Sequence, residues 1–319
     1  MPTIRPVPDA MSDVLSLVKM RCGVVCANDF AAPFSLDFHR PGAQFHILER
    51  GAAFLVFDGE APIRVGAGDL LILPLGEGHV LTTDPTLRPV PVDRAIQDLA
   101  VRHGSVLQWG RGNGAQTRTI CGQFYFEGVL APRLLAVLPA LIHIREQDAR
   151  PLEWLRLISH FLSEETRRAD PGANMMTARL LELMFIQALR EWGAHGPQSA
   201  GWLSGLLDQH LGKALSAIHD EPARDWTVES LATLAGLSRA AFAARFPAVV
   251  GQPPLQYLTT WRLNLAADQL RIGTARIAEI AEKVGYGSEA ALVRAFKAQF
   301  GTTPAAFRRG LSPMEATAT

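Results

Sequence analysis

Apolar residues in the last third of the 319-residue chain follow a helical spacing, and the same arrangement occurs twice. In each copy, four apolar positions fall at i, i+3, i+4 and i+7, which places them on one face of a helix. These positions are Val228, Leu231, Ala232 and Ala235 in the first copy, and Ile277, Ile280, Ala281 and Val284 in the second. Each set predicts a short amphipathic helix that buries one face.

The residues that follow these helices are matched as well. Gly236 and Gly285 stand where a left-handed residue ends a helix. Ser238 and Ser288 suit the N-cap of a second helix. Four pairs are separated by 50 positions: Ser238 and Ser288, Phe246 and Phe296, Gly251 and Gly301, and Pro254 and Pro304. Repetition at a fixed offset predicts one unit used twice, a helix-turn-helix whose second helix projects from the surface.

A longer amphipathic stretch, from Leu255 to Arg271, separates the two units and begins after Pro253 and Pro254. Proline suits the first turn of a helix, where its missing N–H would have no partner. The 17 residues from 255 to 271 predict a helical rod of roughly 25 Å. A rod of this size can hold two projecting helices about one DNA turn apart, near 34 Å, on one side of a duplex.

These segments resemble a known family. The sequence Ile-Ala-Glu-Ile-Ala followed by Val-Gly-Tyr at 277–286, and Phe-Lys followed by Phe-Gly-Thr-Thr-Pro at 296–304, is similar to the DNA-binding domain of AraC/XylS-type transcription regulators. The resemblance implies binding of double-stranded promoter DNA through both projecting helices. It also implies contact with RNA polymerase, with activation as the usual result and repression as an occasional one.

The charge distribution agrees with a DNA partner. The whole chain has 31 Lys and Arg residues and 31 Asp and Glu residues, so its formal net charge is zero. From residue 227 to residue 310, however, ten basic residues stand against five acidic ones. A local excess of basic residues favours contact with phosphates.

The side chains expected to face DNA are those opposite the apolar face of each projecting helix. They are Arg239, Ala240, Ala243, Ala244 and Arg245 in the first helix, and Glu289, Ala290, Val293, Arg294 and Lys297 in the second. Three alanines offer little beyond contact with a thymine methyl group, so the first helix is expected to contact mainly the DNA backbone. Pro247 lacks an N–H and is expected to bend or end this helix after Phe246. Arg294 matches an arginine that is common in the family; the alternative for any exposed basic residue is solvated surface.

Residues 1–130 have a different pattern, in which Gly, Pro and Asp separate short apolar runs. Eight runs predict strands: Arg21–Cys26, Phe34–Phe38, Gln44–Leu48, Ala53–Phe57, Ile63–Val65, Leu70–Leu73, His79–Leu81 and Thr119–Phe126. Many short strands at this spacing indicate a sandwich or barrel. The segment Gly68-Asp-Leu-Leu-Ile-Leu-Pro74-Leu-Gly76-Glu-Gly-His79 resembles the second motif of cupins, which are small jelly-roll barrels. Together with Phe45–Glu49 and Leu138–His143, it resembles the cupin-type sensor domain of one AraC-type branch.

The match to cupins is incomplete where a metal would bind. Catalytic cupins present a His-x-His pair, a glutamate and a later histidine; His46 and His79 match two of these positions, but Leu48 replaces the second histidine. Cys121 is a candidate third ligand, because thiolate and imidazole together suit Zn²⁺, and Glu49 and His39 are weaker candidates. The alternative is that both histidines are hydrogen-bonded barrel residues and that Cys121 is a small core residue. The residues expected to line a ligand pocket in the barrel are Phe45, Phe57 and Phe124.

Between residues 134 and 192 the apolar spacing becomes helical, with a break at Asp170-Pro-Gly172. The two predicted apolar faces are Trp154, Leu157, Ile158 and Phe161, and Leu181, Met184, Phe185, Ala188 and Leu189. In the resembling family, such a helical pair follows the barrel and mediates dimerisation, so a homodimer is expected. Packing of the pair on its own barrel is the alternative. The Gly-, Pro- and Ser-containing residues 195–201 predict a linker.

The sequence therefore predicts a multidomain protein of mixed α and β structure. A cupin-like jelly-roll β-barrel at 1–130 is expected to sense a small molecule or a metal ion. A helical dimerisation segment is expected at 131–200, and an all-α tandem helix-turn-helix domain at 201–319. The expected function is sequence-specific regulation of transcription. A metal-dependent cupin enzyme with a helical appendage is the alternative, and the incomplete ligand set disfavours it.

Three cysteines make no disulfide framework and suit a reducing compartment. The first residues lack the apolar core of an export signal, and no stretch reaches the roughly 18 apolar residues that a membrane span requires. A cytoplasmic protein is expected. The sequence names neither the effector nor the DNA site.

Overall fold

The computed structural model of the protein has two compact units that are interleaved along the chain. It describes residues 9–39, 41–94, 101–103, 106–109, 114–146, 153–168, 170–195 and 202–310. The barrel unit comprises Met20–Phe126 and Leu138–Gly196, and the helical unit comprises Met1–Lys19, Glu127–Val137 and Pro197–Thr319. The predicted contiguous ranges 1–130, 131–200 and 201–319 differ from these units, because short segments on either side of the barrel strands fold with the C-terminal helices. The predicted linker at 195–201 lies almost wholly outside the described residues.

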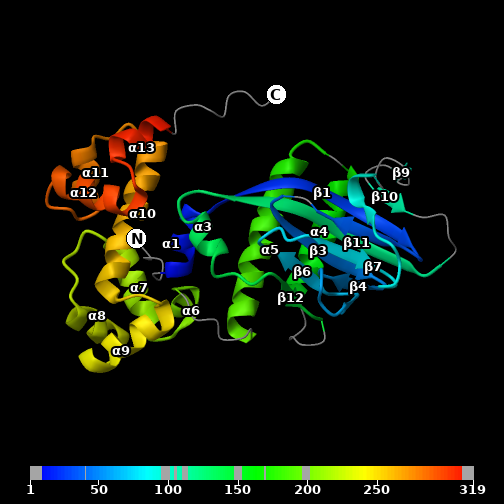
Figure 1. Ribbon diagram of the computed structural model, residues 1–319, viewed down its shortest axis with the longest axis horizontal. Helices are drawn as coiled ribbons and strands as arrows, with labels where there is room; N and C mark the ends of the chain where they lie inside the picture. The colour runs from blue at the N-terminus through cyan, green and yellow to red at the C-terminus, as the bar shows by residue number, and fades with distance from the viewer. Residues whose placement is uncertain are drawn as a thin grey trace, which may run out of the picture. The chain divides into compact units, whose positions relative to one another are not determined.

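Two β-sheets form the barrel unit (Figure 1). Among the described residues, the larger sheet has seven strands in the order β12-β6-β3-β11-β1-β10-β9, and the smaller has five in the order β5-β4-β7-β2-β8. The strands are β1 (Lys19–Ala31), β2 (Ser35–Phe38), β3 (Ala43–Arg50), β4 (Ala52–Val56), β5 (Ile63–Gly66), β6 (Leu70–Leu73), β7 (His79–Thr82), β8 (Val90–Pro91), β9 (Val101–His103), β10 (Val106–Trp109), β11 (Gln116–Glu127) and β12 (Ile142–Ile144). This arrangement confirms the predicted sheet-rich domain.

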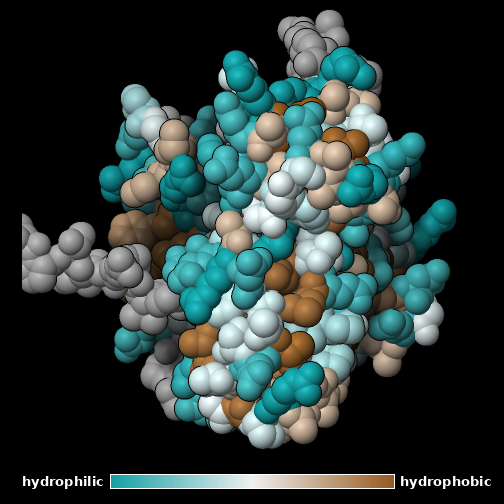
Figure 2. Space-filling model, turned by 90° about the vertical axis from the view of Figure 1, so that its left-hand side faces the viewer, coloured by the Kyte–Doolittle hydropathy of each residue, from teal (hydrophilic) through white to brown (hydrophobic). Residues whose placement is uncertain are grey.

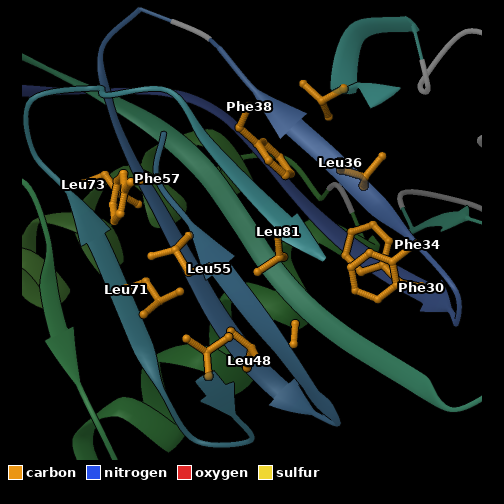
Figure 3. Close-up of a cluster of buried hydrophobic side chains, with 13 residues drawn as sticks. Phe30, Phe34, Leu36, Phe38, Leu48, Leu55, Phe57, Leu71, Leu73 and Leu81 are labelled. Atoms are coloured by element: carbon orange, nitrogen blue, oxygen red, sulfur yellow. The ribbon is translucent and has the colours of Figure 1, made fainter. Parts of the chain in front are cut away.

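An apolar cluster fills the space between strands of the two sheets. Successive side chains of a strand point to opposite faces, so every second residue enters this space. Leu48, Leu55 and Leu81 come from β3, β4 and β7 and are fully buried. Figure 3 shows them with the other labelled members of the cluster, Phe30, Phe34, Leu36, Phe38, Phe57, Leu71 and Leu73. Burial of each such leucine contributes about 1.5–3 kcal/mol, and this cluster therefore holds the two sheets together.

All eight predicted strands are present, with ends that differ by a few residues, but β8, β9, β10 and β12 were not predicted. β12 lies inside the range predicted as helical and pairs with β6 instead, Ile142 opposite Ile72. A three-residue strand is too short for its apolar period to be recognised. The Asp69 side chain also holds β12 in place. Its Oδ2 atom lies 3.1 Å from Nε2 of His143 in β12, and the same atom accepts a hydrogen bond from the Gly66 N–H at 2.9 Å.

Two helices of the barrel unit, α4 (Glu153–Arg168) and α5 (Ala173–His195), pack against each other. Gly172, with φ +94°, occupies the predicted break between them. The predicted apolar face of α5 is confirmed as buried. On α4 the prediction was wrong in part: the buried face contains Leu155, Ile158 and Leu162, whereas Leu157 and Phe161 are 58% and 45% exposed. Because α4 carries apolar residues on two faces and buries only one, sequence spacing alone does not select the correct face.

The longest helix of the helical unit is α10 (Pro254–Ile272). It confirms the helix predicted at 255–271 and is one residue longer at each end. The other helices are α1 (Ala10–Leu17), α3 (Ala131–Leu135), α6 (Trp202–Leu207), α7 (Leu211–Asp220), α8 (Val228–Ala235), α9 (Arg239–Val250), α11 (Ile277–Lys283), α12 (Glu289–Phe300) and α13 (Pro304–Gly310). Figure 1 shows α8 and α9 near one end of α10, and α11 and α12 near the other. The described residues include no helix with the length and hydropathy of a membrane-spanning segment.

Candidate nucleic-acid interface

The turn inside each helix pair is built in the same way. Gly236 and Gly285 have φ values of +67° and +85°, which glycine adopts without a steric penalty. Ser238 Oγ accepts a hydrogen bond at 3.2 Å from the backbone N–H three residues later, and Ser288 Oγ does the same at 3.2 Å. These contacts satisfy backbone donors at the start of α9 and α12. The two helix-turn-helix units are thereby confirmed.

Each projecting helix buries the face that the apolar spacing predicts. Phe242 and Phe246 of α9 are fully buried, as are Leu292 and Phe296 of α12. The Phe242 and Phe246 ring centroids lie 5.3 Å apart, within the usual range for aromatic contacts. The opposite faces of α9 and α12 are therefore left for other contacts.

Pro247 was expected to bend or end α9 after Phe246, and the second alternative is wrong, because the helix does not end there. The helix continues for three residues to Val250, whose side chain is buried on the same face as Phe246. The carbonyl that loses its usual N–H donor belongs to Ala243, and this residue is exposed to solvent. Water can satisfy that carbonyl, so packing of Val250 outweighs the missing hydrogen bond.

The outer face of α9 consists of two arginines and three alanines. The predicted residues Arg239, Ala240, Ala243, Ala244 and Arg245 are all exposed. Arg245 Nη2, however, donates a hydrogen bond to Asp208 Oδ2 at 2.6 Å. Burial alone would raise the pKa of Asp208, but hydrogen bonds from Arg245 and from backbone N–H groups outweigh it and keep that pKa below its usual value. Arg245 is therefore held by a carboxylate and is less available to a phosphate than Arg239.

The outer face of α12 has more charged side chains than that of α9. Glu289, Ala290, Arg294 and Lys297 are exposed, and Val293 is half-buried. Within the described parts of the chain, neither the Arg294 nor the Lys297 side chain has a hydrogen-bond or ion-pair partner. Two unpaired cations with long side chains can reach phosphates or guanine edges in a major groove.

Arg262 fastens the second turn to the rest of the unit. This half-buried residue of α10 donates hydrogen bonds to the backbone carbonyls of Pro222 at 2.6 Å, Gly285 at 3.0 Å and Arg224 at 3.0 Å. A Cβ atom at Gly285 would lie 2.6 Å from Ala223 Cα and 2.9 Å from Arg262 Cζ. The turn before α12 is thus set against α10 and the segment that precedes α8.

Figure 2 shows the side of the molecule on which Figure 1 draws α8, α9, α11 and α12. Hydrophilic residues cover most of this face, and hydrophobic residues are scattered among them. A polar surface of this kind suits contact with a phosphate backbone, where side-chain hydroxyl, amide and cationic groups supply most hydrogen bonds.

In the barrel unit, the structure brings together two of the three predicted metal ligands. His46 Nε2 of β3 and His79 Nε2 of β7 are 2.8 Å apart, and both side chains are buried. Burial lowers the pKa of His79 to about 4 and that of His46 well below its usual value, so both rings are neutral near pH 7. One ring N–H therefore donates to the other ring.

The third predicted ligand, Cys121, has other partners. It lies opposite His46 on the neighbouring strand, but its Sγ is 3.8 Å from Cys26 Sγ and accepts a hydrogen bond from Asn28 Nδ2 at 2.9 Å. The contact with Cys26 and burial raise the pKa of the Cys121 thiol well above its usual value. Zinc binds thiolates, and two tetrahedral nitrogen ligands at about 2.0–2.1 Å would stand farther apart than His46 and His79 do.

These residues do not fit a zinc centre. Within the described ranges, no group of three or more His, Cys, Asp or Glu residues is arranged to hold a metal ion. The sequence-based prediction of zinc in the barrel can be tested directly by metal analysis of the purified protein.

The predicted lining of a barrel pocket needs correction. Phe57 belongs to the apolar cluster between the sheets. Phe45 and Phe124 are fully buried on the other face of the large sheet, where the Phe124 ring lies 5.7 Å from that of Phe185 on α5. The alternation of β3 explains this, because His46 and Leu48 point between the sheets and Phe45 must then point away. Sequence alone did not establish which face the helices cover.

A cavity of about 390 Å³ lies in the barrel unit beside α4. Its polar lining includes Glu49, Arg118, Glu146, Arg156 and Arg167. Arg118 donates two hydrogen bonds to Asp29, and Arg156 pairs with Glu146. The cavity therefore combines charged groups of both signs with enough room for a small polar molecule.

Comparison with known proteins joins the barrel and the helix pairs to one family. A cupin model matches residues 9–194, and a helix-turn-helix domain model matches residues 231–310. A putative AraC-like transcription regulator from Streptomyces lividans is 35% identical over 304 residues, which cover 94% of this chain and 98% of that protein. This chain belongs to the AraC family of transcription regulators. It is a DNA-binding regulator with an N-terminal cupin domain, and the enzyme alternative is set aside because its relatives are regulators.

Other similar proteins are transcription regulators, and two of them match most of the chain. The transcriptional regulator AlkR from Acinetobacter baylyi is 31% identical over 265 residues, covering 83% of this chain and 87% of that protein. The RCS-specific transcriptional activator RclR from Escherichia coli K12 is 34% identical over 259 residues, covering 78% and 89%. The solved DNA-binding domain of AdpA in complex with a target DNA is 32% identical and covers 32% of this chain and 93% of that chain, with a TM-score of 0.31.

Two features of this AraC-family regulator were missed by sequence reasoning. Arg262 was counted among the basic residues suited to phosphate, but its guanidinium binds backbone carbonyls instead. Its place between the apolar Trp261 and Leu263 was the available signal. The second feature is that α1 belongs to the helical unit, where the Ala10 N–H donates to Ser216 Oγ at 3.2 Å. No local pattern indicates such a long-range partner.

Proposed function

We propose that this AraC-family regulator reads promoter DNA mainly through α12, with α9 supplying contacts to the phosphate backbone. In this proposal it acts as a cytoplasmic homodimer that responds to an effector in the barrel unit. The proposal also includes a contact with RNA polymerase, which the family resemblance implies.

Base selection is assigned to α12 because the outer faces of α9 and α12 differ in their side chains. Arg294 and Lys297 are exposed and have no partner among the described residues, whereas three of the five predicted positions on α9 are alanines. A guanidinium can bind guanine O6 and N7 with two hydrogen bonds, which discriminates against other bases by about 1–3 kcal/mol. An alanine methyl group contributes only apolar contact. Base selection is therefore assigned chiefly to Arg294.

The first experiment identifies the DNA and then tests Arg294. Sequencing of the fragments that the purified protein retains from its own genome defines a binding site. Substitution of Arg294→Ala is expected to weaken binding to that site by about 1–3 kcal/mol in a gel-shift titration. Arg64→Ala, which removes an exposed arginine from β5 in the barrel unit, is the matched control and should leave the midpoint unchanged. An unchanged midpoint for Arg294→Ala would remove this residue from the site.

Exposed apolar side chains on α4 and α5 support a homodimer. Of eight large apolar side chains found exposed in the described part of the chain, five lie on these helices: Leu157, Phe161, Met175, Met176 and Leu183. Helices that cover a sheet normally turn such residues inward, and an exposed apolar surface commonly marks an interface. A second copy of the chain is the proposed occupant.

The dimer is tested by light scattering coupled to gel filtration. Leu157→Glu combined with Phe161→Glu places two charges on this surface and is expected to give monomers. The matched control, Ala61→Glu combined with Arg64→Glu, places two charges at exposed positions of the barrel unit away from α4 and α5 in the sequence, and is expected to leave dimers. A monomeric wild-type protein at working concentrations would contradict the proposed dimer without affecting the assignment of Arg294.

The effector is assigned to the 390 Å³ cavity of the barrel unit, whose paired charges suit a small polar molecule. Ser159 Oγ donates to Glu49 Oε1 at 2.9 Å across this site, joining α4 to β3. An effector that competes for Glu49 would alter this link. Substitution of Glu49→Gln is expected to abolish the effector's influence on DNA binding while basal binding remains.

A further inference from the structure

A second cavity, of about 240 Å³, lies inside the helical unit. It is bounded by α1, by the residues around α3, by the end of α9 and by α10. Much of its wall is apolar and is formed by Val14, Leu130, Val137 and Val250. Its volume is about eight times that of a water molecule in the liquid, so it suits a small organic molecule.

Polar groups on one face of α10 line the same cavity. Thr260, Trp261 and Asn264 are 6%, 4% and 3% exposed. Among the described residues, the buried Trp261 indole N–H has no hydrogen-bond partner. Buried polar groups in native proteins almost always have partners, so a buried, unpartnered N–H in a residue that lines a cavity indicates a polar ligand or water there.

Arg133, at the end of α3, supplies the only described cationic side chain in this lining. It is half-buried and has no carboxylate partner among the residues that the structure describes. Burial lowers the pKa of its guanidinium, since the charged form has lost part of its hydration. Nearby groups are already engaged: Tyr257 Oη lies 2.7 Å from His219 Nε2, and Asp13 Oδ2 lies 3.5 Å from His219 Nδ1.

We propose that this cavity binds a small organic monocarboxylate with an apolar body. The carboxylate would pair with Arg133, whose planar guanidinium offers two parallel N–H donors, and the apolar body would lie against the valine and leucine side chains. One cation matches one negative charge, whereas a phosphate dianion would leave a charge unpaired in an apolar site.

The place of the cavity connects this ligand to DNA binding. Its walls come from segments that directly precede β1 and follow β11, and from the helix that joins the two helix-turn-helix units. α10 contacts α9, α11 and α12. A molecule bound against α10 therefore favours the arrangement of reading helices that fits it best. This inference rests on the family assignment and not on which helix selects bases.

The test measures thermal unfolding of the full-length protein with octanoate and benzoate, each compared with its uncharged amide, octanamide or benzamide. At least one acid is expected to raise the unfolding temperature in a concentration-dependent manner, because it binds only the folded state. The corresponding amide should bind at least about tenfold more weakly, since it lacks the charge-assisted hydrogen bonds.

Three variants decide the site. Arg133→Gln is expected to weaken acid binding at least about tenfold, and Ala136→Phe, at an exposed position of the lining, is expected to abolish it by obstructing the cavity. Arg64→Gln, which removes an exposed arginine of the barrel unit, should bind the acid as the wild type does. Equal effects of acids and amides, no effect of either acid on the wild type, or undiminished binding by Arg133→Gln would each overturn the proposal. DNA binding measured without acid tests the proposed function separately.

Discussion

The two helix-turn-helix pairs have the same framework but present different outer faces. Both have a left-handed glycine in the turn, a serine N-cap and buried aromatic residues on the second helix. At outer positions 50 apart, however, Ala244 corresponds to Arg294 and Pro247 corresponds to Lys297. The framework is fixed by packing and turn geometry, whereas the outer face is free to vary. Duplication of a fold therefore does not duplicate its recognition chemistry.

The two pairs are also fastened to the helical unit by different contacts. In the first, Arg245 of α9 pairs with Asp208 in the turn before α7. In the second, Arg262 of α10 holds the Gly285 carbonyl, and no space remains at Gly285 for a side chain. The first contact is one ion pair between an exposed arginine and a half-buried aspartate, and the second is a set of three hydrogen bonds from a half-buried arginine. The second pair is expected to be the more sensitive to changes in its turn.

The largest expected change in stability is the one caused by substituting the turn glycine of the second pair, compared with the same substitution in the first pair. Gly285→Ala combines a positive φ with contacts below 3 Å, and is expected to lower the free energy of unfolding by about 3 kcal/mol. Gly236→Ala has a positive φ but no atom within 4 Å of the new Cβ, and should cost about 1–2 kcal/mol. Denaturant unfolding followed by circular dichroism measures both. Equal losses would mean that the second turn is no more tightly held than the first.

An intermediate effect is expected when the outer face of α9 is made to resemble that of α12. Ala244→Arg adds a cation at the position that corresponds to Arg294. One additional phosphate contact should steepen the dependence of the logarithm of the DNA-binding constant on the logarithm of salt concentration by about 0.9. Fluorescence anisotropy at several salt concentrations measures this slope. An unchanged slope would show that α9 does not lie near the DNA backbone.

The smallest effect concerns the ion pair of the first unit. Since the pKa of Asp208 is lowered in the folded protein, its contribution to stability is present above its ordinary pKa, near 3.8, and is lost as the pH falls through the lower folded value. Because Arg245 is exposed, Asp208→Asn should cost below about 1 kcal/mol at pH 6. That difference from wild type should shrink below about pH 4. A pH-independent difference would contradict the ion-pair explanation.

Sequence patterns were most successful where a local rule sufficed. Ser238 and Ser288 were recognisable because an N-cap depends on a backbone N–H only three residues away. The strands of the first 130 residues were recognisable because apolar runs and turn residues alternate there. The patterns failed where two faces of one element were both apolar, as at Leu157 on α4 and Phe45 on β3. Which face is buried depends on an element elsewhere in the chain.

The DNA-facing residues and the barrel residues also differ in whether their surroundings can be inferred from nearby sequence. Exposure of Arg294 follows from its place opposite the apolar face of its own helix. The partner of Cys121 does not follow from its own strand, because Cys26 lies 95 residues earlier and meets it only when β1 and β11 join the same sheet. The proposed metal set was therefore beyond what spacing could decide.

By itself, the sequence determined the two helix-turn-helix units, the helix between them, most strands of the barrel and the family. Hydrogen bonds and apolar spacing within a few residues encode all of these. Only the tertiary structure decided that α1 and α3 join the C-terminal helices, that Arg262 binds carbonyls and that a cavity forms beside Arg133. These features require groups that are distant in the chain to meet, and burial and hydrogen bonding among such groups depend on the completed fold.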